Sequence, residues 1–362
     1  MSQPRDSILS LNRIHDIGAG RKETILLDKN ERITPFPKEF FNDFLKSLTP
    51  EDFIKYPDQS ELYRRLAEFY HLEFDQILLV PGSDAGLKYI FETYSKPKNH
   101  VVHLQPTYAM VPVYIDMFDC QPVVAQFHND LSFSSETLGD QLSLDTTLAI
   151  VANPNQPTGT LLSIEQLERL AIKADQTNTL LVIDEAYHDF TDEPSAISLI
   201  PRFQNLCVLK TFSKAWGLAG LRLGFLAAPH NITQQLIKVK PLHDINSIAI
   251  AASLLLLDHY QIVDSYKYAI QDSMRKLSAA CKKANLDFLP THCNFAYVRI
   301  PHEVDSHELI ATLGRQNFRV RLSNNTGTCL DGCLRFTVGP WEEMNSFFKA
   351  LETSIEDSLK KG

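Results

Sequence analysis

The sequence predicts an α/β protein in which a mostly parallel sheet lies between helices, followed by a smaller α+β domain. Between residues 60 and 230, short apolar runs alternate with segments of helical period. These runs lack the alternation of a half-exposed strand, and strands that are apolar throughout are typical of parallel sheets covered on both faces. From about residue 260 the pattern changes to one long helical segment followed by shorter strands.

The elements of the first part follow one another in a regular order. Residues 62–72 carry apolar side chains at helical spacing, and the apolar run 76–80 stops at Pro81-Gly82, which is a turn signal. By the same criteria, further helices are expected at 86–94 and 163–175, and further strands at 100–104, 147–152, 179–187 and 206–213.

The second part begins after an apolar stretch at 247–257, which is too short to span a bilayer and is therefore expected to be a buried helix. Helical segments are then expected at 260–285 and 342–361, with strands at 294–300, 318–322 and 333–338. We therefore predict an N-terminal arm over residues 1–45, a large domain over 46–258 and a small C-terminal domain over 259–362.

The composition narrows the possible partners. The chain has 362 residues and a formal net charge of −9, which disfavours a nucleic-acid-binding surface because such surfaces need clustered Lys and Arg. The N-terminal segment has no apolar core of a secretory signal, so we expect a cytoplasmic protein without membrane contact. The six cysteines form no C-x-x-C pair, and we expect no metal.

Chemically useful side chains follow four of the apolar runs. Asp184, Lys214, the amide pair Asn155-Gln156 and the Gly82-Ser83 helix start each come at or just after the end of a predicted strand. Ligands of open parallel sheets bind at the carboxyl ends of the strands, so we expect these groups to meet in one site. Arg222 adds a fork-shaped cation suited to a phosphate. Together they could hold a phosphorylated aromatic cofactor that the lysine attacks.

The motifs that contain these residues resemble those of fold-type I pyridoxal-phosphate enzymes, and within that group the histidinol-phosphate aminotransferase family. The resemblance implies a seven-stranded, mostly parallel sheet in the large domain and the cofactor pyridoxal 5'-phosphate. The matching segments occur in family order: LDKNE (27–31), KYPD (55–58), PGSDAGL (81–87), QPTYAM (105–110), NPNQPTG (153–159), DEAYHDF (184–190), TFSKAWGLAGLRLGF (211–225) and GCLRFTVG (332–339).

The resemblance also implies catalytic roles. Lys214 would bind the cofactor aldehyde covalently and then move protons. Asp184 would pair with the nitrogen of the pyridine ring, which lets the ring accept electrons. Tyr187 would donate a hydrogen bond to the ring's phenolic oxygen, and Tyr108 would stack on the ring face.

The phosphate of the cofactor would be held by a second group of residues. By resemblance these are the hydroxyls of Thr211 and Ser213, the guanidinium of Arg222, and the amides of Ser83 and Asp84. Tyr56 would reach the phosphate of a neighbouring subunit, so a homodimer is the expected assembly.

Two departures from the family pattern concern the site. Where the family has Asn-Asn-Pro-Thr-Gly, Gln156 replaces the second Asn, so either the loop shifts or Asn155 takes over its contact. The family's Asn-Glu-Asn-Pro segment becomes Asn30-Glu31-Arg32-Ile33, which puts histidinol phosphate itself in doubt as the substrate. Asn30 and Arg32 are therefore candidates for substrate binding.

Substrate recognition is expected to rest mainly on Arg335 and Arg321, since in the broader group the arginine matching Arg335 holds a substrate anion. The resemblance implies an aminotransferase that moves an amino group from glutamate or a similar donor to a small phosphorylated carbonyl compound. A decarboxylase of a phosphorylated amino acid shares the cofactor-holding residues and remains an alternative. A catalytically silent scaffold would be expected to lack Lys214 or Asp184, and both are present.

Overall fold

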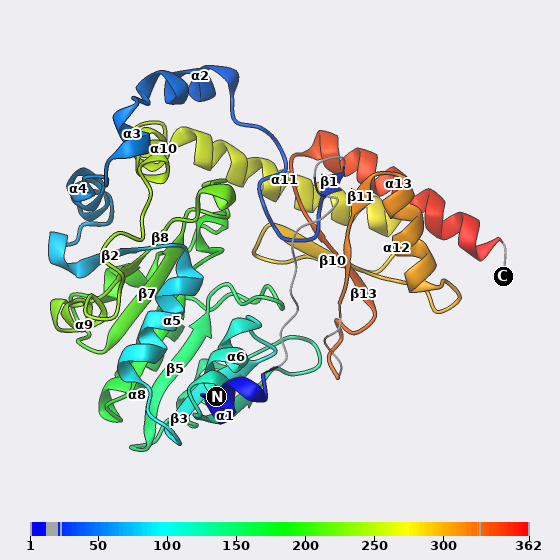
Figure 1. The fold of residues 1–362 in the computed structure, drawn as a ribbon. Coiled ribbons are helices and arrows are strands. Elements are labelled where there is room, and N and C mark those ends of the chain that lie inside the picture. Colours follow the sequence, from blue (N-terminus) through cyan, green and yellow to red (C-terminus); the bar gives the residue numbers. More distant parts are fainter. Residues whose placement is uncertain (1, 12–20, 22–23, 324, 326, 361–362) are drawn as a thin grey trace.

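The computed structural model describes residues 2–11, 21, 24–323, 325 and 327–360. It confirms the α/β class: a seven-stranded sheet lies between two layers of helices, and a smaller sheet with its own helices forms the C-terminal part (Figure 1). The long helix α11 (Gln261–Lys283) leads from the first part into the second.

The large sheet has the strand order β2-β8-β7-β6-β5-β3-β4. Strand β8 runs antiparallel to both of its neighbours, and the other pairs are parallel. The strands are β2 (Ile77–Val80), β3 (His100–Gln105), β4 (Gln121–Gln126), β5 (Thr146–Ala152), β6 (Leu180–Asp184), β7 (Leu206–Thr211) and β8 (Gly224–Ala227).

Five of these strands match the apolar runs, whereas β4 and β8 were not expected. Strand β4 lies at the edge of the sheet and is largely exposed, so it lacks the continuous apolar signal of its neighbours. The run expected at 179–187 ends as a strand at Asp184 because the chain turns there. The turn is held by the Ala186 amide, which donates a hydrogen bond to the Asp184 carboxylate at 3.0 Å.

Helices cover both faces of this sheet. On one face α5, α6 and α9 share an apolar cluster with the strands, and on the other face α4, α8 and α10 belong to a second cluster that continues into the C-terminal part. The helices are α4 (Ser60–Tyr70), α5 (Ser83–Tyr94), α6 (Met110–Met117), α7 (Ser135–Gly139), α8 (Ile164–Gln176), α9 (His230–Leu236) and α10 (Ser247–Asp258), with short 3-10 turns η1 (Phe74–Gln76), η2 (His188–Phe190), η3 (Ala196–Leu199) and η4 (Ala219–Leu221).

The C-terminal part contains an antiparallel sheet of order β12-β13-β10-β9. The strand expected at 318–322 is split at Val320, because β11 pairs in parallel with β1 (Ile25–Leu26) while β12 pairs with β13. The domain boundaries expected after residues 45 and 258 remain predictions. The elements are β9 (Phe288–Leu289), β10 (Phe295–Arg299), α12 (Ser306–Arg315), β11 (Phe318–Arg319), β12 (Arg321–Leu322), β13 (Cys333–Thr337) and α13 (Trp341–Leu359).

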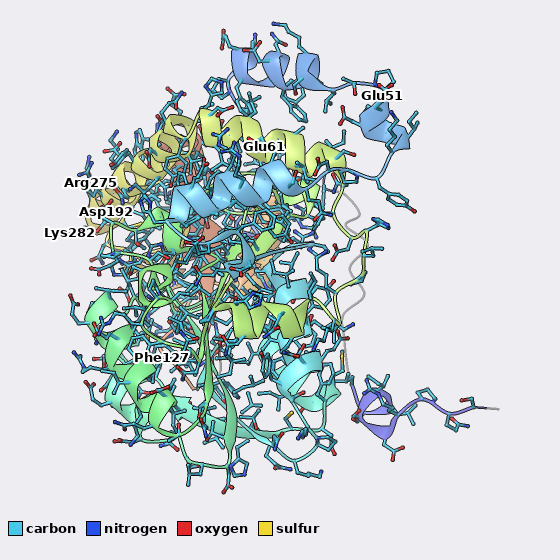
Figure 2. All side chains as sticks on the ribbon, turned by 90° about the vertical axis from the view of Figure 1, so that its left-hand side faces the viewer. Glu51, Glu61, Phe127, Asp192, Arg275 and Lys282 are labelled. Atoms are coloured by element: carbon cyan, nitrogen blue, oxygen red, sulfur yellow. The ribbon has the colours of Figure 1, made fainter. Side chains whose placement is uncertain are left out.

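Three helices near the N-terminus lie at the periphery: α1 (Asp6–Leu9), α2 (Lys38–Ser47) and α3 (Glu51–Ile54). In Figure 2, Glu51 marks α3, which stands with α2 outside the main body of side chains. No single helix among the described residues is long and apolar enough to cross a membrane. Helices α10 and α11 pass that test only as a pair, and the chain bends by 78° between them.

Candidate active site

One cavity lies where the strands β5, β6 and β7 end, next to the start of α5. We call it the inner cavity. The structure brings ten of the residues expected from the sequence to its wall: Ser83, Asp84, Tyr108, Gln156, Asp184, Tyr187, Thr211, Ser213, Lys214 and Arg222.

Lys214 opens a tight turn just after β7. The Gly217 amide donates a hydrogen bond to the Lys214 carbonyl at 2.9 Å, and Gly217 has a φ of 76°, a conformation that favours glycine. The Lys214 Nζ donates to the Lys29 carbonyl at 2.9 Å and lies 5.4 Å from the centre of the Tyr187 ring. Burial lowers the pKa of Lys214 to about 8. This amine therefore loses its proton far more readily than an exposed lysine does.

Electrostatic neighbours act on the Lys214 pKa in both directions. Glu31 raises it, whereas the guanidiniums of Arg335 and Arg222 lower it further, as like charges do. Arg222 lies on the inner cavity and Arg335 does not, so the amine responds to cations on two sides.

Asp184 occupies the last position of β6 and is only 8% exposed. Burial raises the pKa of its carboxyl to about 6, although the hydrogen bond from the Ala186 amide acts in the opposite direction. The carboxylates of Asp84 and Glu185 raise this pKa further, and Lys214 lowers it. A buried carboxylate of this kind gains most from a cationic N–H partner, which would replace the water it has lost.

The part of the inner cavity formed by the start of α5 and by Arg222 is suited to an anion. The twelve-residue helix α5 begins there, so its first amides and the positive end of its dipole face the cavity. The Arg222 guanidinium donates to the Ser213 hydroxyl at 3.2 Å. It also lies against Gly82, where an added Cβ would come within 2.7 Å of Arg222 Nη2. The glycine thus leaves the room in which the cation sits.

The loop after β5 places its two amide side chains differently. Gln156 lines the cavity, whereas Asn155 lies behind the wall and is 1% exposed. The Asn155 amide donates to the Pro106 carbonyl at 3.1 Å and to the Thr158 hydroxyl at 2.9 Å. Asn155 therefore braces the loop, and the longer Gln156 is the residue that reaches the cavity.

A second hollow, which we call the outer cavity, adjoins the inner one. Both are lined by Tyr108, Gln156, Tyr187 and Lys214, so these four residues form a wall common to the two cavities. The outer cavity contains both arginines expected to hold substrate, Arg335 and Arg321.

The two arginines are neighbours across the β12–β13 pair. Arg335 is 7% exposed and donates to the Asp28 carbonyl at 2.7 Å, while its Nε has no hydrogen-bond partner in the described part of the chain. Arg321 is more exposed, and burial together with Arg335 lowers its pKa. A buried donor without a partner and a second cation beside it favour an anionic ligand.

The structure separates the two candidates of the N-terminal segment. Asn30 lines the outer cavity and donates a hydrogen bond to the Tyr187 hydroxyl at 2.9 Å. Arg32 is not among the described residues that line either cavity. Its guanidinium lies 4.6 Å from the centre of the Phe36 ring and 4.1 Å from that of Tyr266. These aromatic faces hold the cation away from the cavity.

Tyr56 also lies away from both cavities of its own chain. It is 76% exposed, and its ring stacks on His243 with 3.9 Å between the ring centres. Exposed apolar side chains surround this part of the N-terminal region: Phe41, Leu45, Phe53 and Ile54.

Several residues of the outer cavity were not expected from the sequence. Asp28, Lys29, Tyr297, Ser323 and Asn325 belong to its wall. Asp28 and Lys29 lie in the LDKNE motif and could have been proposed with Asn30. Tyr297 sits within an apolar strand, and nothing in its sequence context distinguishes it from a core residue.

Three comparisons bear on the site. The family model "Aminotransferase class I and II" matches residues 25–351. The histidinol-phosphate aminotransferase of Christiangramia forsetii is 31% identical over 303 residues, which cover 82% of this chain and 85% of that protein. The crystal structure of histidinol-phosphate aminotransferase from Sinorhizobium meliloti in complex with pyridoxal-5'-phosphate superposes with a TM-score of 0.86 at 22% identity, covering 99% of this chain and 98% of the other.

A structure with a different activity is also similar. L-threonine-O-3-phosphate decarboxylase from Porphyromonas gingivalis has a TM-score of 0.75 at 22% identity, covering 92% of this chain and 99% of the other. At this identity the two structures show a shared fold.

Proposed function

The chain belongs to the aminotransferase class I and II family, and from this premise we propose that it transfers an amino group from glutamate or a similar donor to a small phosphorylated carbonyl compound, with pyridoxal 5'-phosphate as cofactor. One observation carries the proposal: the Lys214 amine, the Asp184 carboxylate and the Arg222 guanidinium line a single cavity.

The chemistry of the inner cavity fits this cofactor. The start of α5, the hydroxyls of Thr211 and Ser213, and Arg222 form a cradle for its phosphate. The buried Asp184 would accept the N–H of the pyridine ring, and Tyr108 would cover a ring face. Tyr187 and Gln156 would face the phenolic oxygen. When bound, the cofactor supplies a ring that withdraws electrons from the substrate α-carbon.

The residues then divide the work between them. Lys214, whose pKa is lowered to about 8, would be the base that takes the proton from the donor's α-carbon and the acid that delivers it to the cofactor carbon to which the amino nitrogen is bound. Asp184 keeps a proton on the ring nitrogen. Arg335 would bind an anionic group of the substrate with its guanidinium, and Arg321 would bind from the open side.

We also propose that the working unit is a cytoplasmic homodimer. The exposed Tyr56 and the apolar side chains of α2 and α3 support an interface on this side, where Tyr56 would contact the phosphate in a partner's inner cavity. The described cysteines are all free thiols, which agrees with a reducing compartment.

The test is the visible absorption spectrum of the purified protein with pyridoxal phosphate, before and after L-glutamate is added. We expect a yellow band from the lysine-bound cofactor that bleaches with glutamate, and 2-oxoglutarate as the product. Release of CO₂ from a phosphorylated amino acid, with no response to any amino donor, would instead identify a decarboxylase. A protein that forms no band contradicts the proposed chemistry.

A further inference from the structure

A cluster of charged side chains is buried next to the segments that line the inner cavity. Lys210 on β7 is 1% exposed, and its Nζ contacts the Glu185 carboxylate at 3.3 Å and the Asp189 carboxylate at 2.6 Å. Successive side chains of a strand point to opposite faces, so Lys210 points away from the face on which Thr211 lines the cavity. None of the roles proposed above uses this cluster.

Each charge of the cluster has a partner. Burial opposes the charge on Lys210, but Asp189 and Glu185 outweigh it and raise the pKa of this lysine. Burial acts against the charge on Asp189 as well, yet Lys210, His188 and the Trp216 indole together outweigh it and hold the pKa of that carboxyl below its usual value. Glu185 also accepts hydrogen bonds from the Ser195 hydroxyl and from the Ala196 amide, both at 2.6 Å.

A buried ion pair of this kind contributes little net stability, because the cost of removing two charges from water offsets their attraction. It does fix geometry, since each group loses its partner if the surrounding segments move. The relevant question is therefore which segments the cluster joins.

Asp189 joins the two segments that carry the proposed catalytic groups. It lies in η2, which directly follows Asp184 and Tyr187 along the chain. Its Oδ1 accepts from Lys210, and its Oδ2 accepts from the Trp216 indole N–H at 2.9 Å. Trp216 lies in the tight turn that Lys214 opens, and it is 2% exposed. One carboxylate thus holds both segments.

We propose that Asp189, itself held by Lys210, is a positioning residue that sets the placement of Lys214 relative to Asp184 and Tyr187. It contacts neither cavity and acts only through the segment that follows β6 and the turn that follows β7. This role rests on the proposed aminotransferase function. It accounts for a buried charged cluster next to a site whose reaction depends on the alignment of an amine and a ring.

The first test is the Trp216→Phe variant, which removes the indole donor and keeps an aromatic ring against Phe212 and Tyr260. Trp341→Phe is the matched control, because Trp341 is the other tryptophan of the chain and lies on α13. We expect kcat to fall about 10-fold in Trp216→Phe while KM for glutamate stays within about 2-fold. The visible circular dichroism per bound cofactor should fall to roughly half or less, since it reports how the ring sits relative to the protein.

Asp189→Ala removes both links and should lower kcat by about 100-fold with the same change in visible dichroism. If that variant fails to fold, Trp216→Phe decides alone. Variants that melt at a lower temperature but keep the wild-type kcat and visible dichroism below that temperature would overturn the positioning role and leave the proposed function intact. A wild-type protein that forms no yellow band would overturn both.

Discussion

The inner and outer cavities share four lining residues but are built in different ways. The inner cavity is lined by residues at or just beyond the ends of buried strands and by the start of one helix, within short motifs of the chain. The outer cavity combines segments far apart in the sequence, residues 28–30, 321–323, 325 and 335, and Arg321 is exposed. Buried strand ends hold groups at fixed positions, whereas loops and strand edges are the parts in which binding surfaces vary.

The segment 28–29 connects the two cavities. Its Asp28 carbonyl accepts a hydrogen bond from Arg335, and its Lys29 carbonyl accepts one from Lys214. Asp28 and Lys29 are adjacent in the chain, so an anionic group bound by Arg335 would lie near the Lys214 amine. The difference between the cavities suggests that changes in the inner cavity act on turnover and changes in the outer cavity act on affinity.

The largest expected effect is that of Lys214→Ala. It removes the amine that the proposal makes both the covalent anchor and the proton carrier, so turnover should fall by about 10,000-fold or more. The glutamate half-reaction followed by absorbance measures this loss. Lys88→Ala, on the outward side of α5, is the control and should behave as the wild type. Substantial turnover without Lys214 would contradict its role.

Asp184→Asn should come next, with a loss of about 100- to 1,000-fold in kcat. Asparagine has the same shape but no charge with which to keep a proton on the ring nitrogen. We expect the variant still to bind the cofactor, because the cradle of α5 and Arg222 is unchanged. Equilibrium dialysis of the cofactor and steady-state kinetics separate the two. Near-normal turnover would refute the assigned role of Asp184.

The same contrast decides how much could be predicted from the sequence. Asp184 and Lys214 were identifiable because each comes at or just after an apolar run, and the ends of parallel strands meet at one edge of the sheet. Each apolar run predicts a strand and the residue at which it ends, and parallel pairing brings the ends of the strands together. The local sequence therefore suffices to place Asp184 and Lys214 in one site. The edge strand β4 lacks such a run, and the antiparallel strand β8 follows a Gly-rich segment. Neither strand was therefore expected.

The outer cavity was less predictable, because its residues meet only through tertiary packing. Arg32 is the clearest case: the sequence shows a cation near the substrate segment but not the rings of Phe36 and Tyr266 that hold it elsewhere. The sequence also left open whether Asn155 or Gln156 faces the cavity. The hydrogen bonds that Asn155 donates to Pro106 and Thr158 fix the orientation of its side chain. Thr158 is a close neighbour, but Pro106 lies 49 residues away in the chain.

Arg335→Ala should change affinity more than turnover. Loss of a buried, charge-assisted donor predicts a rise of about 10- to 100-fold in the KM of the anionic substrate. Arg321→Ala should raise KM by only about 3- to 10-fold, since Arg321 is more exposed. Steady-state kinetics and cofactor dialysis on both variants test this order. An equal loss of cofactor affinity and substrate affinity would place Arg335 outside the substrate site.

The smallest expected effect tests whether the cavities act independently. Only the unprotonated Lys214 amine attacks an aldehyde, so the rate at which the cofactor-free protein takes up pyridoxal phosphate should rise with pH and level off above the lysine pKa of about 8. Arg335 lowers this pKa and Glu31 raises it. The midpoint should therefore move up slightly in Arg335→Ala and down slightly in Glu31→Gln. Both shifts should be small because burial, the main cause, is unchanged. Stopped-flow absorbance across the pH range measures the midpoints, and shifts of the same sign would show that the outer cavity does not tune the amine through its charges.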